Sequence, residues 1–291
     1  MGRMEYLVHL AIIFAIYAIL AVSLQLIVGF TGLISLAHAA FYGVGAYSVA
    51  LILENTGFGF FPALILGILV SAVAAFLIGI VLSKFRDDYY ALGSLGFTVI
   101  VFSIFLNWQE LTRGPLGIPG INRPELFGFV FSENIVYLGL ALILLGLCYA
   151  FSTFVTKSSF GRALQAIRED EVALSVFGYH TSWFKLAVFV MGAGMAAIAG
   201  GLFASYITFI DPSSFGVPES VFMLSVIILG GLGSLRGAVI GALVLVLLPE
   251  ALRFVGFTPD IAAQMRQVIY GLMLVFLMLY RPQGLAGTYR L

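Results

Sequence analysis

The stretch KSSFGRALQAIREDEVALSVFGYHTSWFK, from Lys157 to Lys185, is a polar island inside an apolar sequence. It carries seven of the chain's 28 formal charges, and long apolar runs flank it on both sides. Charged side chains are costly in the hydrocarbon core of a bilayer, so this segment must lie in water between two membrane spans. The island therefore predicts a membrane protein with an exposed element on which a soluble partner could dock.

The composition of the whole chain supports a membrane fold. Of its 291 residues, 62% are hydrophobic and only 10% are charged, whereas a soluble domain has about 45–50% apolar and about 25% charged residues. The apolar runs are unbroken and do not alternate in segments of about ten residues, as β-barrel strands would. We predict an all-α polytopic membrane protein, with one transmembrane domain over residues 1–291 and a cytoplasmic loop at 157–185.

Charge and cysteine content exclude several other classes. The formal net charge is zero, and no basic patch suggests a nucleic-acid partner. The single cysteine, Cys148, lies in an apolar run and cannot form an internal disulfide, so we read it as a small buried residue.

A helix needs about 20 apolar residues to cross a bilayer, and on this basis we expect roughly eight to ten membrane segments. The clear candidates are Tyr6–Val28, Phe60–Ser83, Tyr89–Trp108, Ile135–Val155, Phe184–Ile210 and Ala262–Tyr280. Two further stretches, Leu33–Leu53 and Ser220–Leu248, are apolar but interrupted by glycines.

Basic residues in short loops orient the chain, because they favour the cytoplasmic side. If the spans alternate, eight of the 14 basic residues fall on one side: Lys84, Arg86, Lys157, Arg162, Arg168, Lys185, Arg281 and Arg290. That side, with the C-terminus, is predicted to be cytoplasmic. The N-terminus lies outside if Leu33–Leu53 crosses fully, and inside if that stretch dips in and returns.

The two glycine-interrupted stretches resemble each other weakly. One reads GFTGLISLAHAAFYGVGAYSVALI from Gly29, and the other reads GGLGSLRGAVIGALVLVL from Gly230. Paired, broken segments in two halves of a chain indicate an internal repeat around a transport pathway, although ordinary small-residue helix packing gives the same pattern. The candidate residues of a translocation path are Gly32, Ser35, His38, Gly43, Gly45, Gly230, Gly231, Gly233 and Ser234.

His38 is the most notable ionisable residue at membrane depth. Such a side chain tends to face the bundle interior or a cavity. It lies either near the translocation path or between helices as a neutral, hydrogen-bonded histidine.

The island itself has the pattern of two short helices. Phe160, Ala163, Leu164 and Ile167 form one helical stripe. The acids Glu169, Asp170 and Glu171 suit the positive start of a second helix, which Gly178 would end. Together the two helices would make a rigid knob; the alternative is a solvated amphipathic loop without a partner.

Motifs for chemistry are missing from the sequence. There is no G-x-x-x-x-G-K-[ST] phosphate loop, no HExxH, no cysteine pair and no nucleophile–base set. The three histidines are scattered, so we predict neither a catalytic nor a metal site. If transport by this chain is driven by ATP, separate subunits must supply the nucleotide sites. The loop Gln109–Asn134, rich in glycine and proline, is either an outer docking site or a simple connection.

Ordered blocks along nearly the whole chain carry a family resemblance. They are GLISLAHAAFYGVGAY from Gly32, SFGRAL from Ser159, AIRE from Ala166, GGLGS from Gly230, LPE from Leu248 and RPQGL from Arg281. In this order they resemble the inner-membrane permease subunits of branched-chain amino acid ABC transporters. One departure is Arg113, which interrupts a stretch that in the family is usually Thr-Gly-Gly.

The resemblance implies that the island is the cytoplasmic coupling loop, fitting a groove on an ATPase. It implies coupling residues Glu171, Ala173 and Gly178, with Gly161, Arg162, Arg168 and Glu169 upstream. It also implies an importer that moves branched-chain amino acids by alternating access. The partners would be a second related permease, two ATP-binding-cassette ATPases, an extracytoplasmic substrate-binding protein and membrane lipid.

On this reading the chain is not itself an enzyme and binds no cofactor, and ATP and Mg²⁺ bind the ATPase subunits. The expected location is a bacterial or archaeal inner membrane. Two alternatives stay open: a related ABC importer for urea or short amides, and a stand-alone secondary transporter.

Overall fold

The computed structural model describes residues 3–126, 129–254, 268, 271–272, 275 and 283–287. Helices dominate this part of the chain. In chain order they are α1 (Arg3–Leu24), η1 (Gln25–Gly29), α2 (His38–Thr56), α3 (Phe60–Leu82), α4 (Asp87–Asn107), α5 (Gln109–Thr112), η2 (Gly114–Leu116), α6 (Asn134–Lys157), α7 (Ser159–Val176), α8 (Thr181–Ile207), η3 (Pro212–Phe215), α9 (Val217–Gly230) and α10 (Leu235–Phe254). The four short strands are β1 (Ile118–Pro119), β2 (Glu125–Leu126), β3 (Phe129–Val130) and β4 (Phe209–Ile210).

The structure confirms the all-α polytopic membrane fold. In its described part, five helices are long and apolar enough to cross a membrane alone: α1 continued by η1, α3, α4, α6 and α8. The pair α9 and α10, bent by 119° at a short break, raises this to six. The predicted total of eight to ten also counted Leu33–Leu53, which begins as a non-helical stretch and continues into α2, and Ala262–Tyr280, most of which lies outside the described residues.

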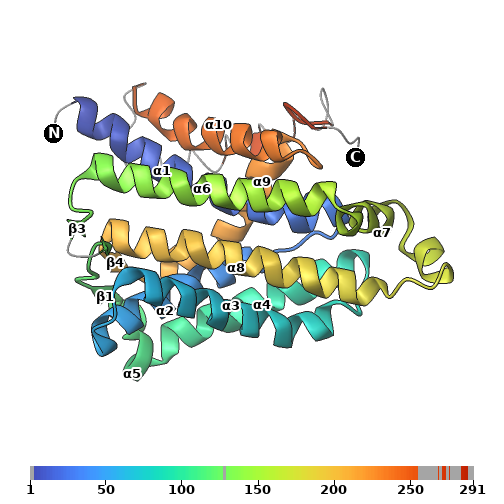
Figure 1. Ribbon diagram of the computed structural model, residues 1–291, viewed down its shortest axis with the longest axis horizontal. Coiled ribbons are helices and arrows are strands. Elements are labelled where there is room, and N and C mark those ends of the chain that lie inside the picture. The colour runs from blue at the N-terminus through green and yellow to red at the C-terminus, as the bar shows by residue number, and fades with distance from the viewer. Residues whose placement is uncertain are drawn as a thin grey trace.

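The long helices lie side by side and give the bundle two distinct ends (Figure 1). At one end are the N-terminus, α5 and the short strands; we call this the β1 end. At the other lies α7, and we call it the α7 end. The charged island is thus confined to one end of the bundle, as expected for a segment that must remain in water.

Burial separates central from peripheral spans. In the most apolar 18-residue stretch of each span, 78% of the residues are buried in α1 with η1 and 72% in α8, against 28% in each of α3, α4 and α6. Helix α8 packs along α2 and α3, which its run GAGMAAIAGG, residues 192–201, allows because small side chains let helices approach closely. Large apolar side chains on α3 and α6, such as Leu77 and Phe154, are exposed and suited to lipid.

The β1 end is closed by two-residue strands. Strand β1 pairs antiparallel with β4, and β2 pairs with β3. Arg113 forms an ion pair with Glu54 at the end of α2, and its φ of 58° is left-handed. Glycine adopts that backbone region without the steric cost that a side chain brings, so arginine is an uncommon residue at this position.

Two breaks interrupt the helices: the first is the non-helical stretch of residues 32–37 before α2, and the second lies between α9 and α10. Gly32 lies against the Arg168 side chain of α7, whereas Glu54 lies at the β1 end. The chain from Gly32 to Glu54 therefore runs from one end to the other, first non-helical and then as α2. This geometry is that of a crossing segment, and it sets the N-terminus and α7 at opposite ends (Figure 1).

Candidate functional site

Helix α7 consists of two short helices that meet at a kink. Asp170 has φ −159° and ψ 99°, which is extended backbone inside an otherwise helical segment. Its carboxylate Oδ1 accepts a hydrogen bond from the Ala173 backbone N–H at 2.9 Å, and so caps the second helix. That helix ends at Val176, and Gly178 follows with φ 88°. The predicted pair of short helices is confirmed, with Asp170 as the cap.

The first short helix is attached to the bundle. The Ser158 hydroxyl accepts from the Gly161 N–H at 3.3 Å, and Gly161 lies so close to the Thr156 backbone that a side chain there would collide with it. Of the predicted stripe, Ala163, Leu164 and Ile167 are buried. Arg162 and Glu169 remain exposed, so they are available to a partner.

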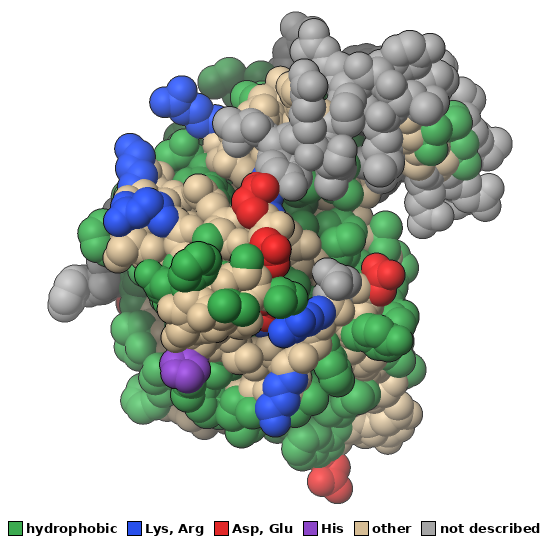
Figure 2. Space-filling view, turned by 90° about the vertical axis from the view of Figure 1, so that its right-hand side faces the viewer, with side chains coloured by type: hydrophobic (Ala, Val, Ile, Leu, Met, Phe, Trp, Pro, Cys, Tyr) green, Lys and Arg blue, Asp and Glu red, His purple; other side chains and the backbone are tan. Residues whose placement is uncertain are grey.

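The second short helix exposes apolar side chains to water. Val176 and Phe177 are each 80% exposed, and Ala173 and Gly178 are also exposed. Figure 2 shows the α7 end, where basic and acidic side chains gather around patches of hydrophobic ones. A soluble surface gains nothing from such exposed apolar groups, and contiguous ones mark interaction sites.

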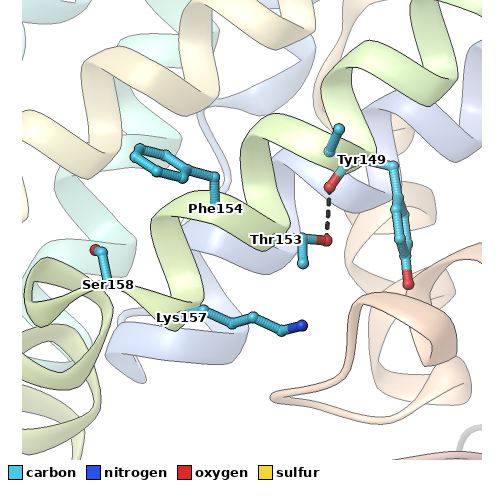
Figure 3. A pocket seen from close by; sticks show the side chains of 6 residues that line it. Tyr149, Thr153, Phe154, Lys157 and Ser158 are labelled. Atoms are coloured by element: carbon cyan, nitrogen blue, oxygen red, sulfur yellow. Dashed lines mark hydrogen bonds between the residues drawn. The ribbon is translucent and has the colours of Figure 1, made fainter.

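Between the two short helices and the start of α8 lies a groove of about 480 Å³. It is lined by Ser159, Phe160, Arg162, Ala163, Ala166, Leu174, Tyr179 and Phe184. A second, more open groove of about 580 Å³ runs along the end of α6, where Tyr149, Thr153, Phe154 and Lys157 occupy neighbouring turns (Figure 3). Its lining is almost wholly apolar, which fits contact with lipid.

Glu171, predicted to meet a partner, points into the protein. Its side chain is only 13% exposed, and Oε1 lies 2.8 Å from the Lys185 ammonium. The Thr181 hydroxyl donates to the same oxygen at 2.9 Å, and Arg86 lies 3.9 Å from Oε2. The predicted coupling residues differ in exposure: Arg162, Glu169, Ala173 and Gly178 are exposed, Gly161 is buried, and Arg168 and Glu171 are half-buried.

Arg168 links α7 to the first break. Its guanidinium donates to the carbonyl of Gly29, the last residue of the π-helix η1, and its aliphatic stem covers Gly32. A π-helix is uncommon and often marks a functional position in a longer helix. The island is thus in direct contact with the end of α1.

The start of α2 lies inside the bundle and is capped by side chains of other helices. The Leu36 N–H donates to the Ser94 hydroxyl at 2.9 Å, and the Leu36 carbonyl accepts from Thr98 and from Ser220, each at 2.6 Å. The Ser220 hydroxyl also accepts from the Ala39 N–H at 3.2 Å. These bonds satisfy backbone groups that a broken helix leaves open in a dry interior.

Replacing Ser220 by valine should destabilise the protein, because the Ala39 N–H would lose its acceptor in the bundle interior. A buried donor left unsatisfied costs about 1–3 kcal/mol. The matched control is Ser225→Val on the same helix, because within the part of the chain that the structure describes the Ser225 hydroxyl bonds only to the Val221 carbonyl, one turn earlier. The thermal midpoint in detergent should fall for Ser220→Val and hold for Ser225→Val; equal midpoints would contradict the capping role.

His38 and Ser35 lie in the same region. The Ser23 hydroxyl of α1 lies 2.6 Å from His38 Nε2, and His38 is 1% exposed. Ser35 is buried, and its hydroxyl lies 3.4 Å from the Ala37 N–H. The structure thus gives His38 a hydrogen bond between α1 and α2, which is the second of its two predicted environments.

The second break meets the first. Helix α9 ends at Gly230 and α10 begins at Leu235, and Gly231 and Gly233 between them have φ of 109° and 77°. The Gln25 amide of η1 donates to the carbonyls of Gly231, at 3.0 Å, and Ser234, at 3.3 Å. A Cβ atom on Gly29 would lie 2.9 Å from the Gly233 nitrogen, and the Gly29 carbonyl accepts from Arg168 of α7, so the two stretches that looked alike in sequence touch near the α7 end.

The other predicted path residues, Gly43 and Gly45, lie in the contacts of α2. A side chain on Gly43 would meet Phe105 and Phe215, and one on Gly45 would meet Ala197 of α8. They act here as close-packing positions within one subunit.

Sequence reasoning missed Gln25, Lys185 as a buried residue, and the capping serines. A glutamine within an apolar run was the one available signal for Gln25.

Residues 283–287 also pack at the second break: Leu285 and Ala286 donate backbone hydrogen bonds, each of 2.9 Å, to the carbonyls of Leu229 and Gly230. Of the predicted RPQGL block, Arg281 and Pro282 lie outside the described residues, as does Arg290.

Comparison with known proteins identifies the family. Residues 6–278 match the family described as the permease component of the branched-chain amino acid transport system. The chain is 37% identical to the high-affinity branched-chain amino acid transport system permease protein LivM of Salmonella typhimurium, over 96% of this chain and 69% of the relative. It is 28% identical to the permease protein LivH of the same kind of system in Escherichia coli, over 93% and 91% of the two chains.

A more distant relative is the probable branched-chain amino acid transport permease protein LivM of Methanocaldococcus jannaschii, 24% identical over 94% of this chain and 90% of the relative. No solved structure matches the chain significantly. With the family match covering nearly the whole helical bundle, this chain belongs to the permease-component family of branched-chain amino acid transport systems.

Proposed function

We propose that this chain is a transmembrane permease subunit of an ATP-binding-cassette importer and that it moves branched-chain amino acids. The names of its relatives support the substrate class. The observation that carries the ATP-driven reading is α7, a two-helix knob with exposed charges and exposed Val176 and Phe177 at one end of a membrane bundle.

In this proposal α7 docks on an ATPase subunit in the cytoplasm, where ATP and Mg²⁺ bind. A second related permease completes the pathway, and an extracytoplasmic binding protein delivers substrate at the β1 end. The C-terminus would then be cytoplasmic, which the contacts of residues 283–287 near the α7 end support, and the N-terminus would be outside. Closure of the ATPases would move the helices between two arrangements, as alternating access requires.

The proposal makes the exposed face of α7 the site of assembly. Phe177→Asp should reduce copurification of the ATPases with the permease by at least about tenfold, because burying an unpaired carboxylate in an apolar contact costs more than the 1.4 kcal/mol that a factor of ten requires. The matched control is Leu116→Asp in η2 at the opposite, β1 end, where another large apolar side chain is 82% exposed.

Copurification from cells that express all subunits, followed by quantitative blotting, provides the measurement. If Phe177→Asp copurified as much ATPase as the wild-type permease does, α7 would not be the docking element. Uptake by the chain alone in liposomes, driven by an ion gradient, would instead favour a secondary transporter. Uptake of urea or short amides in preference to leucine by the assembled complex would correct the substrate.

A further inference from the structure

We propose that Glu171 and Lys185 form an internal latch, through which movement of the second short helix of α7 reaches the central span α8 and the α3–α4 turn. Glu171 is then a positioning residue, not a residue of the docking surface. This inference rests on the proposed function, since it concerns how the docked element passes motion to the membrane helices.

The first observation is the burial of the pair. Lys185 is the fifth residue of α8 and is 1% exposed, and among the described residues its ammonium has two oxygen partners: Glu171 Oε1 at 2.8 Å and the Phe85 carbonyl at 3.0 Å. A buried ammonium is tolerated only when it is paired and hydrogen-bonded. Lys185 is thereby bound to two separate segments of the chain.

The second observation is what the carboxylate holds. Besides Lys185, Glu171 accepts from the Thr181 hydroxyl at the start of α8 and lies 3.9 Å from Arg86, next to Phe85 in the α3–α4 turn. The Glu171 carboxylate therefore connects three segments: the first turn of the second short helix, the start of α8 and the turn that joins α3 to α4.

The third observation is the kink at Asp170, which divides α7 into two parts with different attachments. The part before it is fastened to α6 at Ser158 and to the end of α1 through Arg168. The part after it is fastened by Glu171 to α8 and the α3–α4 turn. The kink separates these attachments, so a force on the exposed side of the second helix acts first on α8.

The consequence concerns the core of the transporter. Helix α8 is among the most buried spans and packs along α2, whose non-helical lead-in forms the first break. Motion of α8 therefore cannot be local, because close-packed interiors move as units between discrete arrangements. Through the Glu171–Lys185 ion pair, a movement of the docked helix would be passed directly to α8 and to the helices packed against it.

The test uses the assembled importer with its ATPases and binding protein. In Glu171→Gln the amide keeps the volume and one acceptor but loses the charge. We expect normal ATPase copurification, with substrate uptake and the stimulation of ATP hydrolysis by loaded binding protein reduced about 5- to 150-fold, the usual range of coupling between sites. The single variant Lys185→Arg, which retains the charge and the donors, should keep most of the wild-type uptake. Asp88→Asn, at an exposed carboxylate in the first turn of α4, should behave as wild type.

A double variant, Glu171→Met with Lys185→Met, protects the test against misfolding, because replacing both charges by apolar side chains leaves no unpaired ion. It should assemble and be uncoupled. Loss of ATPase copurification in Glu171→Gln, in a chain that elutes as a folded protein, would make Glu171 a docking residue and overturn the latch. Wild-type uptake in the double variant would also overturn it. Failure of the wild-type chain to copurify with any ATPase would instead refute the proposed function.

Discussion

Replacing Gly45 by leucine should prevent the chain from reaching its folded state. A Cβ atom at this position would lie 2.6 Å from the Ala197 carbonyl oxygen and 2.7 Å from the Ala197 Cβ. The atoms that it meets belong to the backbone and first side-chain atom of α8, which cannot rotate away. On the same helix pair, a side chain on Gly200 would collide with the Tyr42 backbone, so α2 and α8 are in close backbone contact at more than one level.

The expected cost is large. Overpacking usually costs about 1–3 kcal/mol, and we expect Gly45→Leu to reach or exceed the upper value because rigid backbone has to move. Leucine favours a helix over glycine by up to about 1 kcal/mol, so helix propensity works in the opposite direction. Any loss must therefore come from the contact with α8.

Gly146→Leu is the matched control. Gly146 also lies in a long helix, α6, but a Cβ atom there would meet no atom of another described helix within 4 Å. The yield of monodisperse protein and its thermal midpoint in detergent should collapse for Gly45→Leu and stay level or rise for Gly146→Leu. A folded Gly45→Leu protein with the wild-type midpoint would show that α2 and α8 are not in contact here.

Glu171→Leu should be the second severe substitution, for an electrostatic reason. It leaves the Lys185 ammonium, 1% exposed, without its carboxylate. Removing one partner of a buried ion pair costs about 3–5 kcal/mol, because the remaining charge stays buried and uncompensated. The Phe85 carbonyl, the other acceptor of Lys185, cannot neutralise that charge.

The pair should respond asymmetrically to substitution. Lys185→Met should cost less than Glu171→Leu, because Glu171 is 13% exposed and retains Thr181 and Arg86 as neighbours. Adding Lys185→Met to Glu171→Leu should restore most of the lost stability, since the unpaired charge disappears. Thermal midpoints of the three variants measure this cycle. Additive losses in the double variant would mean that the two side chains do not interact.

Local chemistry explains which features were predictable. The two short helices of the island follow from Asp170, whose carboxylate can cap a helix, and from Gly178, which adopts a left-handed φ without strain. The long spans follow from unbroken apolar runs such as 60–82, because every backbone polar group in lipid must be bonded within its own helix. Such arguments need only the residues of one segment.

The candidate site was predicted in part. The sequence identified both breaks, since closely spaced glycines interrupt an apolar run only at some cost. It could not show that Gln25 bridges from η1 to Gly231, a pairing of residues that lie far apart in the chain. Nor could it show that Glu171 points inward, because an acid after a helical kink would be equally compatible with an exposed docking contact.

The sequence by itself determined the membrane class, the helical spans, the polar island and its two short helices, because hydropathy, periodicity and capping act over a few neighbouring residues. The tertiary structure alone decided which helices are central and which side chains cap α2. It also decided that Lys185 is buried against Glu171. Those outcomes depend on which helix faces meet in three dimensions. A helix with apolar residues on every side has no distinct face in its sequence, so its packing partners cannot be predicted from that sequence.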